Sequence, residues 1–435
     1  MKKIALISHG CAKNLVDSEL ILGLLSKNGY EITLNEQESD IVIVNTCSFI
    51  HDAEKESVDS ILEMINEGKK VIIAGCLAQK HGKELKKAIP EISAMVGTTD
   101  FTKLIKVIKS LENGTDYVED VSELPEYIYP ETIERQQITV GSSSYIKIAD
   151  GCNYRCGYCI IPYLRGDYHS RKMEDIIREA KTLVKKGVTE IILIAQDTTA
   201  YGIDLYKKPM LSELLKELNK IDGLGWIRIM YAYPTQITDE LLDTIANCEK
   251  VVKYVDIPLQ HSHPEVLKRM NRPAFDYRLM IENIRKRIPN VAIRTAFIVG
   301  YPEETEEEFE HLYNFVKDMK FNKMGVFEYS REKGTPSYSM KPQISKKVMH
   351  ERYKKLMELQ QGISKEINEK FIGKVLPCIV ENITDDGYVT ARSQYDAPEV
   401  DGDVYIKTDK LLTPGDIENV KITSCDEYDL TGELM

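Results

Sequence analysis

Three cysteines with CxxxCxxC spacing are the residues best suited to metal chemistry in this chain: Cys152, Cys156 and Cys159. They follow a short apolar strand predicted over 145–149. Three thiolates on one tight loop can hold three irons of a cubane iron–sulfur cluster and leave the fourth iron open to a substrate or cofactor. A structural zinc site closes with four ligands, and no fourth Cys or His stands at the usual spacing, although His169 keeps a zinc site as an alternative. The spacing favours a cluster with one open iron.

A second set of cysteines lies in the amino-terminal quarter of the chain, where predicted strands alternate with amphipathic helices. The strands are predicted over 3–8, 40–45 and 71–74, and the helices over 14–28, 53–67, 80–88 and 101–111. Continuous apolar strands in such an alternation predict a doubly wound parallel sheet with both faces covered.

Cys11, Cys47 and Cys76 each fall at or just past the carboxyl end of one of these strands. In an open α/β sheet those ends share one edge, so the three thiols can converge. The pattern favours a second three-thiolate site, with three unrelated cysteines at strand ends as the alternative.

The middle of the chain repeats a strand and a helix about six times. The strands are predicted over 145–149, 190–195, 226–231, 254–258, 292–299 and 324–329. Repeated right-handed βα units curve into a full or partial barrel whose site lies at the carboxyl ends of the strands. Several of these ends carry polar residues, as a charged cofactor would need, although ordinary loop polarity would explain about half of them.

A long helix predicted over 345–370 leads into a β-rich segment with turn signals at 385–387 and 414–415, which predicts a small five-stranded barrel. From residue 372 onward there are 14 acidic and 5 basic residues, a net charge of −9. Such a barrel should repel phosphate backbones and attract a basic protein surface, although a solvated acidic face without a partner is the alternative.

Length, charge and composition set the remaining expectations. A chain of 435 residues is too long for one core, and we predict boundaries at 1–115, a linker over 116–143, then 144–371 and 372–435. The net charge of −12 argues against direct nucleic-acid binding. Nine cysteines in a chain without a secretory signal or a membrane-length apolar run predict reduced thiols, a cytoplasmic location and no membrane partner.

With both cysteine sets in view, the chain resembles the radical S-adenosylmethionine (radical SAM) methylthiotransferases over essentially its whole length. The resemblance implies an amino-terminal cluster domain, a radical SAM partial (β/α)6 barrel and a carboxyl-terminal TRAM barrel. Five stretches carry it: GCAKNLVDSE at 10–19, RGDYHSR at 165–171, DIPLQH at 256–261, DAPE at 396–399 and DEYDL at 426–430. Two positions depart from the family pattern, since Ala12 replaces a usual Pro and Glu303 replaces a usual Gly.

These stretches are similar to the branch of the family that methylthiolates the β-carbon of an aspartyl residue in small-subunit ribosomal protein twelve. The alternative within the family is a MiaB-like enzyme acting on tRNA adenosine. The acidic barrel disfavours this alternative, as does Tyr168, which replaces the Glu typical of the MiaB branch. A non-enzymatic zinc or iron–sulfur module that docks on the ribosome is the alternative outside it.

The resemblance also implies the cofactors and their ligands. Two 4Fe-4S clusters would be held by Cys152, Cys156 and Cys159 and by Cys11, Cys47 and Cys76, with SAM as both radical source and methyl donor and an external electron donor. We predict SAM contacts from Tyr158, Gln196, Gln260 and Arg294, each of which could instead be structural. Because a buried arginine needs an anion, either the SAM carboxylate or a neighbouring Asp should pair with Arg294.

Overall fold

The computed structural model describes residues 2–126, 129–138, 141–384 and 388–435. The chain divides into two compact units. The first unit contains 1–140, 150–155 and 159–169, and the second contains 141–149, 156–158 and 170–435. The turn predicted at 385–387 lies outside the described residues, as do 127–128 and 139–140 of the predicted linker.

The first unit is built on a six-stranded parallel sheet in the order β2-β1-β3-β4-β5-β6. Its strands are β1 (Lys3–Ser8), β2 (Glu31–Ile32), β3 (Ile41–Thr46), β4 (Lys70–Gly75), β5 (Ala94–Val96) and β6 (Val118–Asp120). Every residue of β3 is buried, as expected of a central strand covered on both faces. This confirms the predicted sheet, and β6 extends it into the segment predicted as a linker.

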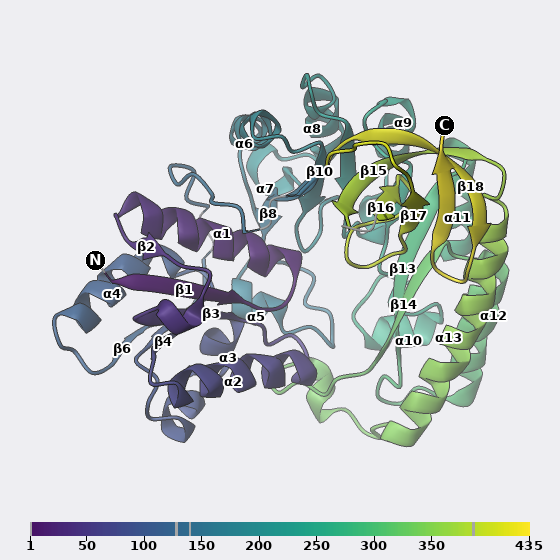
Figure 1. Cartoon of the computed structure of the whole chain (residues 1–435). Helices are drawn as coiled ribbons and strands as arrows, with labels where there is room; N and C mark the ends of the chain where they lie inside the picture. The colour runs from purple at the N-terminus through teal and green to yellow at the C-terminus, as the bar shows by residue number, and fades with distance from the viewer. Residues whose placement is uncertain (1, 127–128, 139–140, 385–387) are drawn as a thin grey trace. The chain divides into compact units, whose positions relative to one another are not determined.

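Helices cover both faces of this sheet, and Figure 1 shows α1 on one side of β1 with α2 and α3 on the other. The helices of the unit are α1 (Ala12–Lys27), α2 (His51–Asn66), α3 (Cys76–Ala88), α4 (Leu104–Glu112) and α5 (Ile161–Arg165), with 3₁₀ turns η1 (Glu36–Glu38) and η2 (Phe101–Lys103). Ile61 and Met64 of α2 and Leu77 of α3 pack with Val44 and Ile73 of the strands in one buried cluster. The apolar faces of the helices therefore account for the buried strands.

The second unit contains a partial barrel of two three-stranded parallel sheets, β7-β10-β11 and β12-β13-β14. An isolated parallel bridge between Ile227 and Val251 lies where the two sheets adjoin. The strands are β7 (Ser143–Lys147), β10 (Glu190–Ile194), β11 (Trp226–Ile229), β12 (Tyr254–Asp256), β13 (Ala292–Val299) and β14 (Lys323–Glu328). The short strands β8 (Ala149–Asp150) and β9 (His169–Ser170) occur where the chain passes between the two units.

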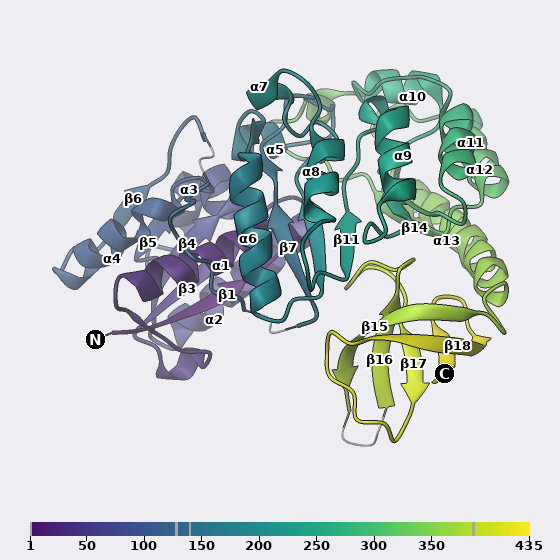
Figure 2. The same cartoon turned by 90° about the horizontal axis from the view of Figure 1, so that it is seen from above.

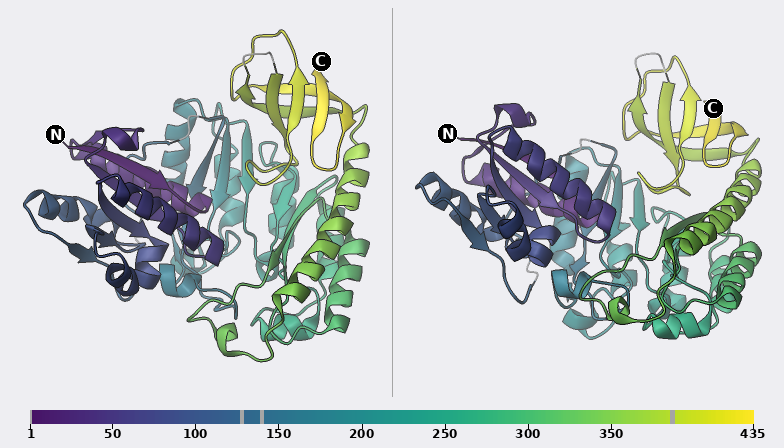
Figure 3. Two further views of the ribbon diagram at one scale, coloured as in Figure 1. Left: turned by 60° about the horizontal axis from the view of Figure 1, so that its bottom comes forward. Right: turned by 90° about the horizontal axis from the view of Figure 1, so that it is seen from below.

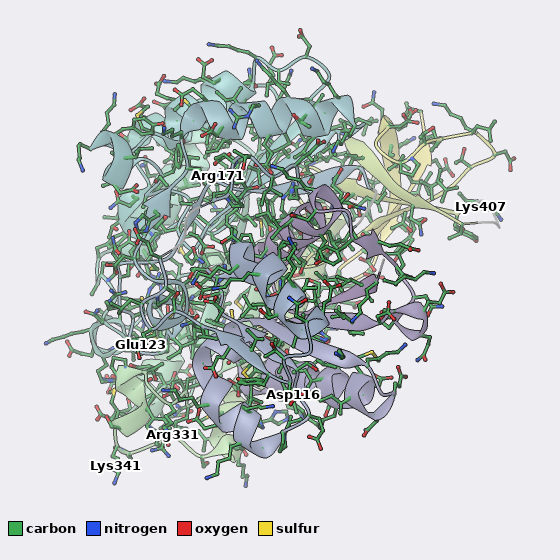
Figure 4. All side chains as sticks on the ribbon, turned by 90° about the vertical axis from the view of Figure 1, so that its left-hand side faces the viewer. Asp116, Glu123, Arg171, Arg331, Lys341 and Lys407 are labelled. Carbon is green, nitrogen blue, oxygen red and sulfur yellow. The ribbon has the colours of Figure 1, made fainter. Side chains whose placement is uncertain are left out.

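Helices line the outer side of this partial barrel, as Figure 2 shows for α6, α8 and α9. They are α6 (Met173–Lys185), α7 (Ile203–Tyr206), α8 (Leu211–Leu218), α9 (Asp239–Asn247), α10 (Pro264–Arg269), α11 (Tyr277–Arg287) and α12 (Glu306–Met319), with η3 (Pro234–Gln236) and η4 (Pro336–Ser339). Arg171, which is labelled in Figure 4, joins β7 to α6. Its Nη1 donates to Lys147 O at 2.9 Å and to Glu179 Oε2 at 2.6 Å. The predicted βα repeat is confirmed.

The long helix α13 (Lys346–Glu369) leads from the partial barrel into a closed five-stranded barrel (Figure 3). Ser345 caps the helix by accepting a hydrogen bond from Val348 N. The barrel strands are β15 (Val375–Ile383), β16 (Tyr388–Ser393), β17 (Val404–Lys407), β18 (Ile417–Cys425) and β19 (Leu430–Leu434). Alternate inward residues such as Val404 and Ile406 fill its core, which confirms the predicted small barrel.

Buried ion pairs join this barrel to the amino ends of the parallel strands. Glu190, the first residue of β10, accepts hydrogen bonds from Arg228 Nε at 2.8 Å and from Arg392 of β16. Lys323, the first residue of β14, pairs with Asp396 at 2.5 Å. The small barrel thus covers the amino ends of these strands, and their carboxyl ends stay available for a site.

Candidate functional site

The three amino-terminal cysteines lie at the carboxyl edge of three adjacent strands. Cys11 is the N-cap of α1 after β1, Cys47 directly follows β3, and Cys76 is the first residue of α3 after β4. Because β1, β3 and β4 are neighbours in the sheet, the predicted convergence of the three loops occurs. The amino ends of α1 and α3 also place partial positive charge beside Cys11 and Cys76, which favours thiolates.

Two glycines let these loops approach each other closely. Gly10 has φ +90°, and a Cβ there would lie 2.6 Å from Cys47 Cβ and 2.8 Å from its Sγ. Gly75 has φ +89°, and a Cβ there would lie 2.5 Å from Asn45 Oδ1. Both positions need a residue without a side chain, since L residues avoid this φ and no space remains.

Buried side chains hydrogen-bond the loops to one another. Asn14 Nδ2 donates to His9 O and Thr46 O, each at 2.9 Å. Asn45 Nδ2 donates to Asn14 O at 3.0 Å. Thr46 Oγ1 donates to Ala74 O at 2.6 Å and accepts from Leu77 N at 3.1 Å. The polar residues at the ends of β1, β3 and β4 therefore fix the relative positions of the three cysteine loops.

The three thiols have different electrostatic surroundings. Cys11 is exposed as a whole residue, whereas Cys47 and Cys76 are buried. Burial raises the pKa of the Cys47 thiol and raises that of Cys76 to about 12. At Cys11, desolvation of the thiol is outweighed by the positive charges of Lys13 and Arg165, so its pKa lies below its ordinary value.

Arg165 supplies positive charge beside this set of cysteines. Its charge opposes the desolvation of the Cys76 thiol and acts on Cys11 and Cys47 as well. The thiols also act on one another electrostatically, since ionised Cys11 and Cys47 raise the pKa of Cys76. A site that must hold three thiolates together gains from such a fixed cation.

The second set, Cys152, Cys156 and Cys159, lies on one loop whose residues belong to both compact units. In the first unit, Cys152 N donates to Gly166 O at 3.1 Å, and Arg155 Nη1 donates to Cys152 O at 2.9 Å. Arg155 also pairs with Asp167 at 2.5 Å. The segment 165–167, within the RGDYHSR stretch, thereby holds the start of the cysteine loop.

In the second unit, Gly157 is held on both sides. Its N–H donates to Met270 O at 2.8 Å, and its carbonyl accepts from Ser337 N at 2.9 Å. A Cβ at this position would lie 2.5 Å from Tyr301 Oη. The middle of the loop, which carries the buried Cys156, is therefore positioned by the backbone at the end of α10 and at η4.

Across the described residues, no three or more His, Cys, Asp or Glu side chains lie close enough together to hold a single metal ion. In a cubane cluster each thiolate binds a different iron, so its cysteines stand farther apart than the ligands of one ion. Each set offers three thiols on positioned loops, and cations stand beside them. The donor chemistry therefore fits iron–sulfur clusters, and the six cysteines stay predictions as ligands.

Two predicted SAM contacts lie at the carboxyl ends of the parallel strands. Gln196 is half-buried two residues past β10. Gln260 is also half-buried, has φ +71°, and bridges to β13 through Gln260 N to Ala296 O and Ile298 N to Gln260 O, both at 2.8 Å. These glutamines occupy the edge where a cofactor of this fold binds, and their contact with SAM stays a prediction.

The third predicted SAM contact, Arg294, lies away from the carboxyl ends of the strands. It is the third residue of β13, five residues before the strand ends, which corresponds to roughly 16 Å along a strand. Its guanidinium pairs with Asp256 at 3.1 Å and with Asp401 at 3.5 Å. The sequence predicted that either the SAM carboxylate or a neighbouring Asp pairs with Arg294. The structure provides the two Asp carboxylates, so the burial of Arg294 is explained without SAM.

Tyr158 packs beside Val266, Met270 and Ile298, and its hydroxyl accepts a hydrogen bond from Arg272 Nη1 at 3.3 Å. The sequence analysis missed Arg272 and assigned no role to Arg165. The RGDYHSR stretch pointed to Arg165, but no local pattern marks Arg272, because its contacts with Pro258, Tyr233 and Tyr158 span 14 to 114 residues of sequence.

Comparison with known families defines the class of protein. The chain matches the model of the radical SAM superfamily over residues 146–316. It matches the family UPF0004, described as uncharacterised, over 3–97 and the TRAM domain over 372–435. With the two cysteine sets, these matches define a radical SAM protein that carries an additional amino-terminal domain and a TRAM barrel.

Whole-length relatives define the family within that class. The chain is 52% identical to a protein of Thermoanaerobacter sp. (strain X514) over 100% of both chains. It is 48% identical to a protein of Carboxydothermus hydrogenoformans over 100% of this chain and 99% of the relative. Both are named ribosomal protein uS12 methylthiotransferase RimO, and this chain belongs to the RimO family.

Solved structures support the fold alone. The radical SAM methyltransferase TsrM from Kitasatospora setae, solved with cobalamin and a [4Fe-4S] cluster, superposes with a TM-score of 0.58 at 14% identity. The match covers 89% of this chain and 80% of TsrM. Among the described residues, we find no helix of sufficient length and apolar character to cross a membrane.

Proposed function

We propose that this chain methylthiolates ribosomal protein uS12, replacing a hydrogen on the β-carbon of an aspartyl residue with a methylthio group. The observation that carries the proposal is the combination of two separate three-cysteine sets with whole-length similarity to RimO proteins. A protein that only bound SAM at one cluster would have no use for the amino-terminal set.

The chemistry requires cofactors, because no side chain removes hydrogen from an unactivated carbon at neutral pH. When bound, SAM and a cluster at the CxxxCxxC loop supply the radical chemistry, and a second cluster supplies the sulfur. The protein holds thiolates at Cys11, Cys47 and Cys76 through the hydrogen bonds of Asn14, Asn45 and Thr46. Gln196 and Gln260 would orient SAM at the carboxyl ends of the strands, and Tyr158 would lie beside it next to the last cysteine of the loop.

The substrate is a basic protein, and the TRAM barrel presents the opposite charge, −9 from residue 372 onward. The same charge disfavours tRNA as the substrate. An external electron donor supplies the reducing equivalents, and we place the reaction in the cytoplasm, where thiols and cluster ligands stay reduced.

The first test measures the iron and sulfide content of anaerobically reconstituted protein. We expect about eight irons per chain, and about four in the variant with Cys11, Cys47 and Cys76 all changed to Ala. About four irons in both proteins would mean that the amino-terminal cysteines hold no cluster, and methylthiolation would have to be abandoned.

The second test incubates the reconstituted protein with SAM, a reductant, and either uS12 or tRNA. Mass spectrometry should show methylthiolated uS12 and unchanged tRNA. Cys156→Ala should abolish SAM cleavage, whereas Cys47→Ala should retain cleavage and lose transfer of sulfur. Modification of tRNA instead of uS12 would overturn the proposed substrate.

A further inference from the structure

Arg272 is a buried cation without a carboxylate partner. Its residue is 8% exposed, Nη2 donates to Pro258 O at 2.8 Å, and Nη1 donates to Tyr158 Oη at 3.3 Å. The guanidinium carbon lies 4.6 Å from the ring centroid of Tyr233. Within the described part of the chain, Arg272 forms no ion pair, and its buried Nε has no hydrogen-bond partner.

Other buried arginines of the same unit are paired. Arg228 and Arg392 both bind Glu190, and Arg352 Nη1 lies 2.7 Å from Glu304 Oε2. Burying a charge is costly unless an opposite charge compensates it, and these three arginines follow that rule. Arg272 is surrounded instead by a carbonyl, a phenol and an aromatic ring, so an anion is missing from its environment.

The position of Arg272 indicates which anion is missing. Helix α10 ends at Arg269, and Asn271, two residues further on, has φ +53°. This left-handed residue turns the chain so that Arg272 N donates to Leu267 O at 2.8 Å. The preceding Met270 carbonyl is the acceptor of Gly157 N. The turn that holds the cysteine loop therefore also fixes the backbone of Arg272.

The electrostatics agree with this placement. Desolvation lowers the pKa of Arg272, but the charges of Tyr158 and Cys156 outweigh it and raise that pKa above its ordinary value. Tyr233 and Tyr277 add smaller contributions in the same direction. None of these four groups is a carboxylate, and only the cysteine is a predicted cluster ligand.

We propose that Arg272 is the buried counter-charge of the iron–sulfur cluster held by the CxxxCxxC loop, and that its positive charge makes this cluster easier to reduce. The inference rests on the proposed function, which assigns a cluster to that loop. Three thiolates around an oxidised [4Fe-4S] core leave one net negative charge, and one electron from the external donor adds a second. A fixed cation stabilises the doubly charged form more, so it raises the midpoint potential. Arg272 is a positioning residue in this proposal and transfers no electron itself.

The test uses the full-length chain with Cys11, Cys47 and Cys76 changed to Ala, so that one cluster is present. The reduced cluster is quantified by electron paramagnetic resonance during a redox titration without SAM. Arg272→Gln should lower the ratio of reduced to oxidised cluster at fixed potential about tenfold or more, a shift of about 59 mV for a one-electron couple. Arg272→Lys should keep most of the wild-type ratio, because it keeps the charge.

Arg285→Gln is the matched control. Arg285 is a partly buried arginine of the same unit whose Nη2 donates to the carbonyls of Met319 and Lys320 at 2.5 and 2.9 Å, and we expect no shift from its loss. If Arg272→Gln lost the cluster while Arg272→Lys kept it, the result would support the proposal, because it would show that the cluster requires a positive charge at this position.

Three results would overturn the proposal. In the first, Arg272→Gln keeps about four irons and the parent potential. In the second, it keeps that potential but binds SAM more weakly, which would assign the guanidinium to the SAM carboxylate. In the third, both substitutions lose the cluster, so hydrogen-bond geometry rather than charge would be essential. Failure of the proposed function is distinguishable, because the parent protein itself would then contain no iron or cleave no SAM.

Discussion

Arg165 and Asp17 form a buried ion pair across 148 residues of sequence, with Nη1 of the arginine 2.9 Å from Oδ2 of the aspartate. The same Nη1 lies 2.8 Å from Asp150 Oδ2, and Nη2 donates to Asn14 Oδ1 at 2.8 Å. Arg165 is 2% exposed, so the network is shielded from water. The GCAKNLVDSE and RGDYHSR stretches, which the sequence shows only as separate motifs, thus share one cation in the first unit.

Loss of that cation should destabilise the first unit strongly. Arg165→Met would remove the cation that pairs with the buried carboxylates of Asp17 and Asp150, and we expect a loss of about 3–5 kcal/mol in unfolding free energy. Urea denaturation followed by circular dichroism measures it. Arg178→Met, which removes an exposed arginine paired with Asp175, is the control and should cost less than about 1 kcal/mol. If the two substitutions lowered the unfolding free energy equally, the buried network would contribute no more to stability than an exposed ion pair.

A second prediction concerns Glu54, which accepts hydrogen bonds from Lys80 at 2.6 Å and Ser48 at 2.5 Å. Desolvation raises the pKa of this carboxyl, but hydrogen bonds from His81, Lys80 and Ser48 outweigh it and lower the pKa to about 2. Because the folded-state pKa lies below the unfolded value of 4.5, the stabilisation is complete above pH 4.5 and is lost as the pH falls toward 2.

Glu54→Gln should therefore cost at most about 3 kcal/mol at pH 7 and progressively less below pH 4.5. Urea midpoints measured at intervals from pH 7 to pH 2 give the difference curve between variant and wild type. The substitution Glu63→Gln, which removes an exposed carboxylate of the same helix, provides the control. A constant difference for Glu54→Gln over the whole range would show that the carboxylate charge is not the source of the stabilisation.

The parts of the fold predicted correctly from the sequence are those with long periodic patterns. The strands predicted over 3–8 and 292–299 have the same bounds in the structure, because both segments are mostly apolar and each is followed by a polar or glycine residue. The strands β2, β5 and β6 were missed, since two or three residues carry no periodicity and pair only because a neighbouring edge is present.

The candidate site divides in the same way. Cys152, Cys156 and Cys159 were singled out by their spacing, and the amino-terminal cysteines by their place at predicted strand ends. Both signals lie in the sequence itself, and the role of these cysteines as ligands stays a prediction. The partners of Arg294 and Arg272 depend on which segments the fold brings together, such as Asp401 of the small barrel with β13. Charge alone could indicate that a buried arginine needs an anion, but it could not indicate which one.

The departure from the family pattern at Glu303 gives a third prediction. Glu303 has φ +68°, a left-handed conformation that costs most L residues about 1–2 kcal/mol and glycine almost nothing. Its carboxylate lies 3.9 Å from Arg269 Nε, and such a long ion pair is too weak to offset the cost of the left-handed conformation. Glu303→Gly should raise the unfolding free energy by up to about 1 kcal/mol, after the entropy that glycine gains in the unfolded chain is subtracted. Thermal unfolding measures the gain, and Glu303→Ala, which removes the charge but keeps the strain, should not reproduce it.

The last prediction tests the close approach of Gly10 to Cys47. A Cβ at residue 10 would lie 2.6 Å from Cys47 Cβ, far inside contact distance, so Gly10→Ala must displace either the Cys11 loop or the Cys47 loop. We expect the reconstituted variant to fall from about eight irons per chain toward about four, because one cubane loses its thiolate geometry while the other is untouched.

Gly29→Ala is a matched control, since Gly29 also has positive φ, +79°, but a Cβ there would meet no atom of the described residues within 4 Å. Both substitutions place a side chain on a residue with positive φ, and only Gly10→Ala adds the collision. Equal iron loss in both variants would attribute the effect to strain in the unit, whereas full iron content in Gly10→Ala would mean that the amino-terminal cysteines tolerate displacement and do not form a tightly positioned cluster site.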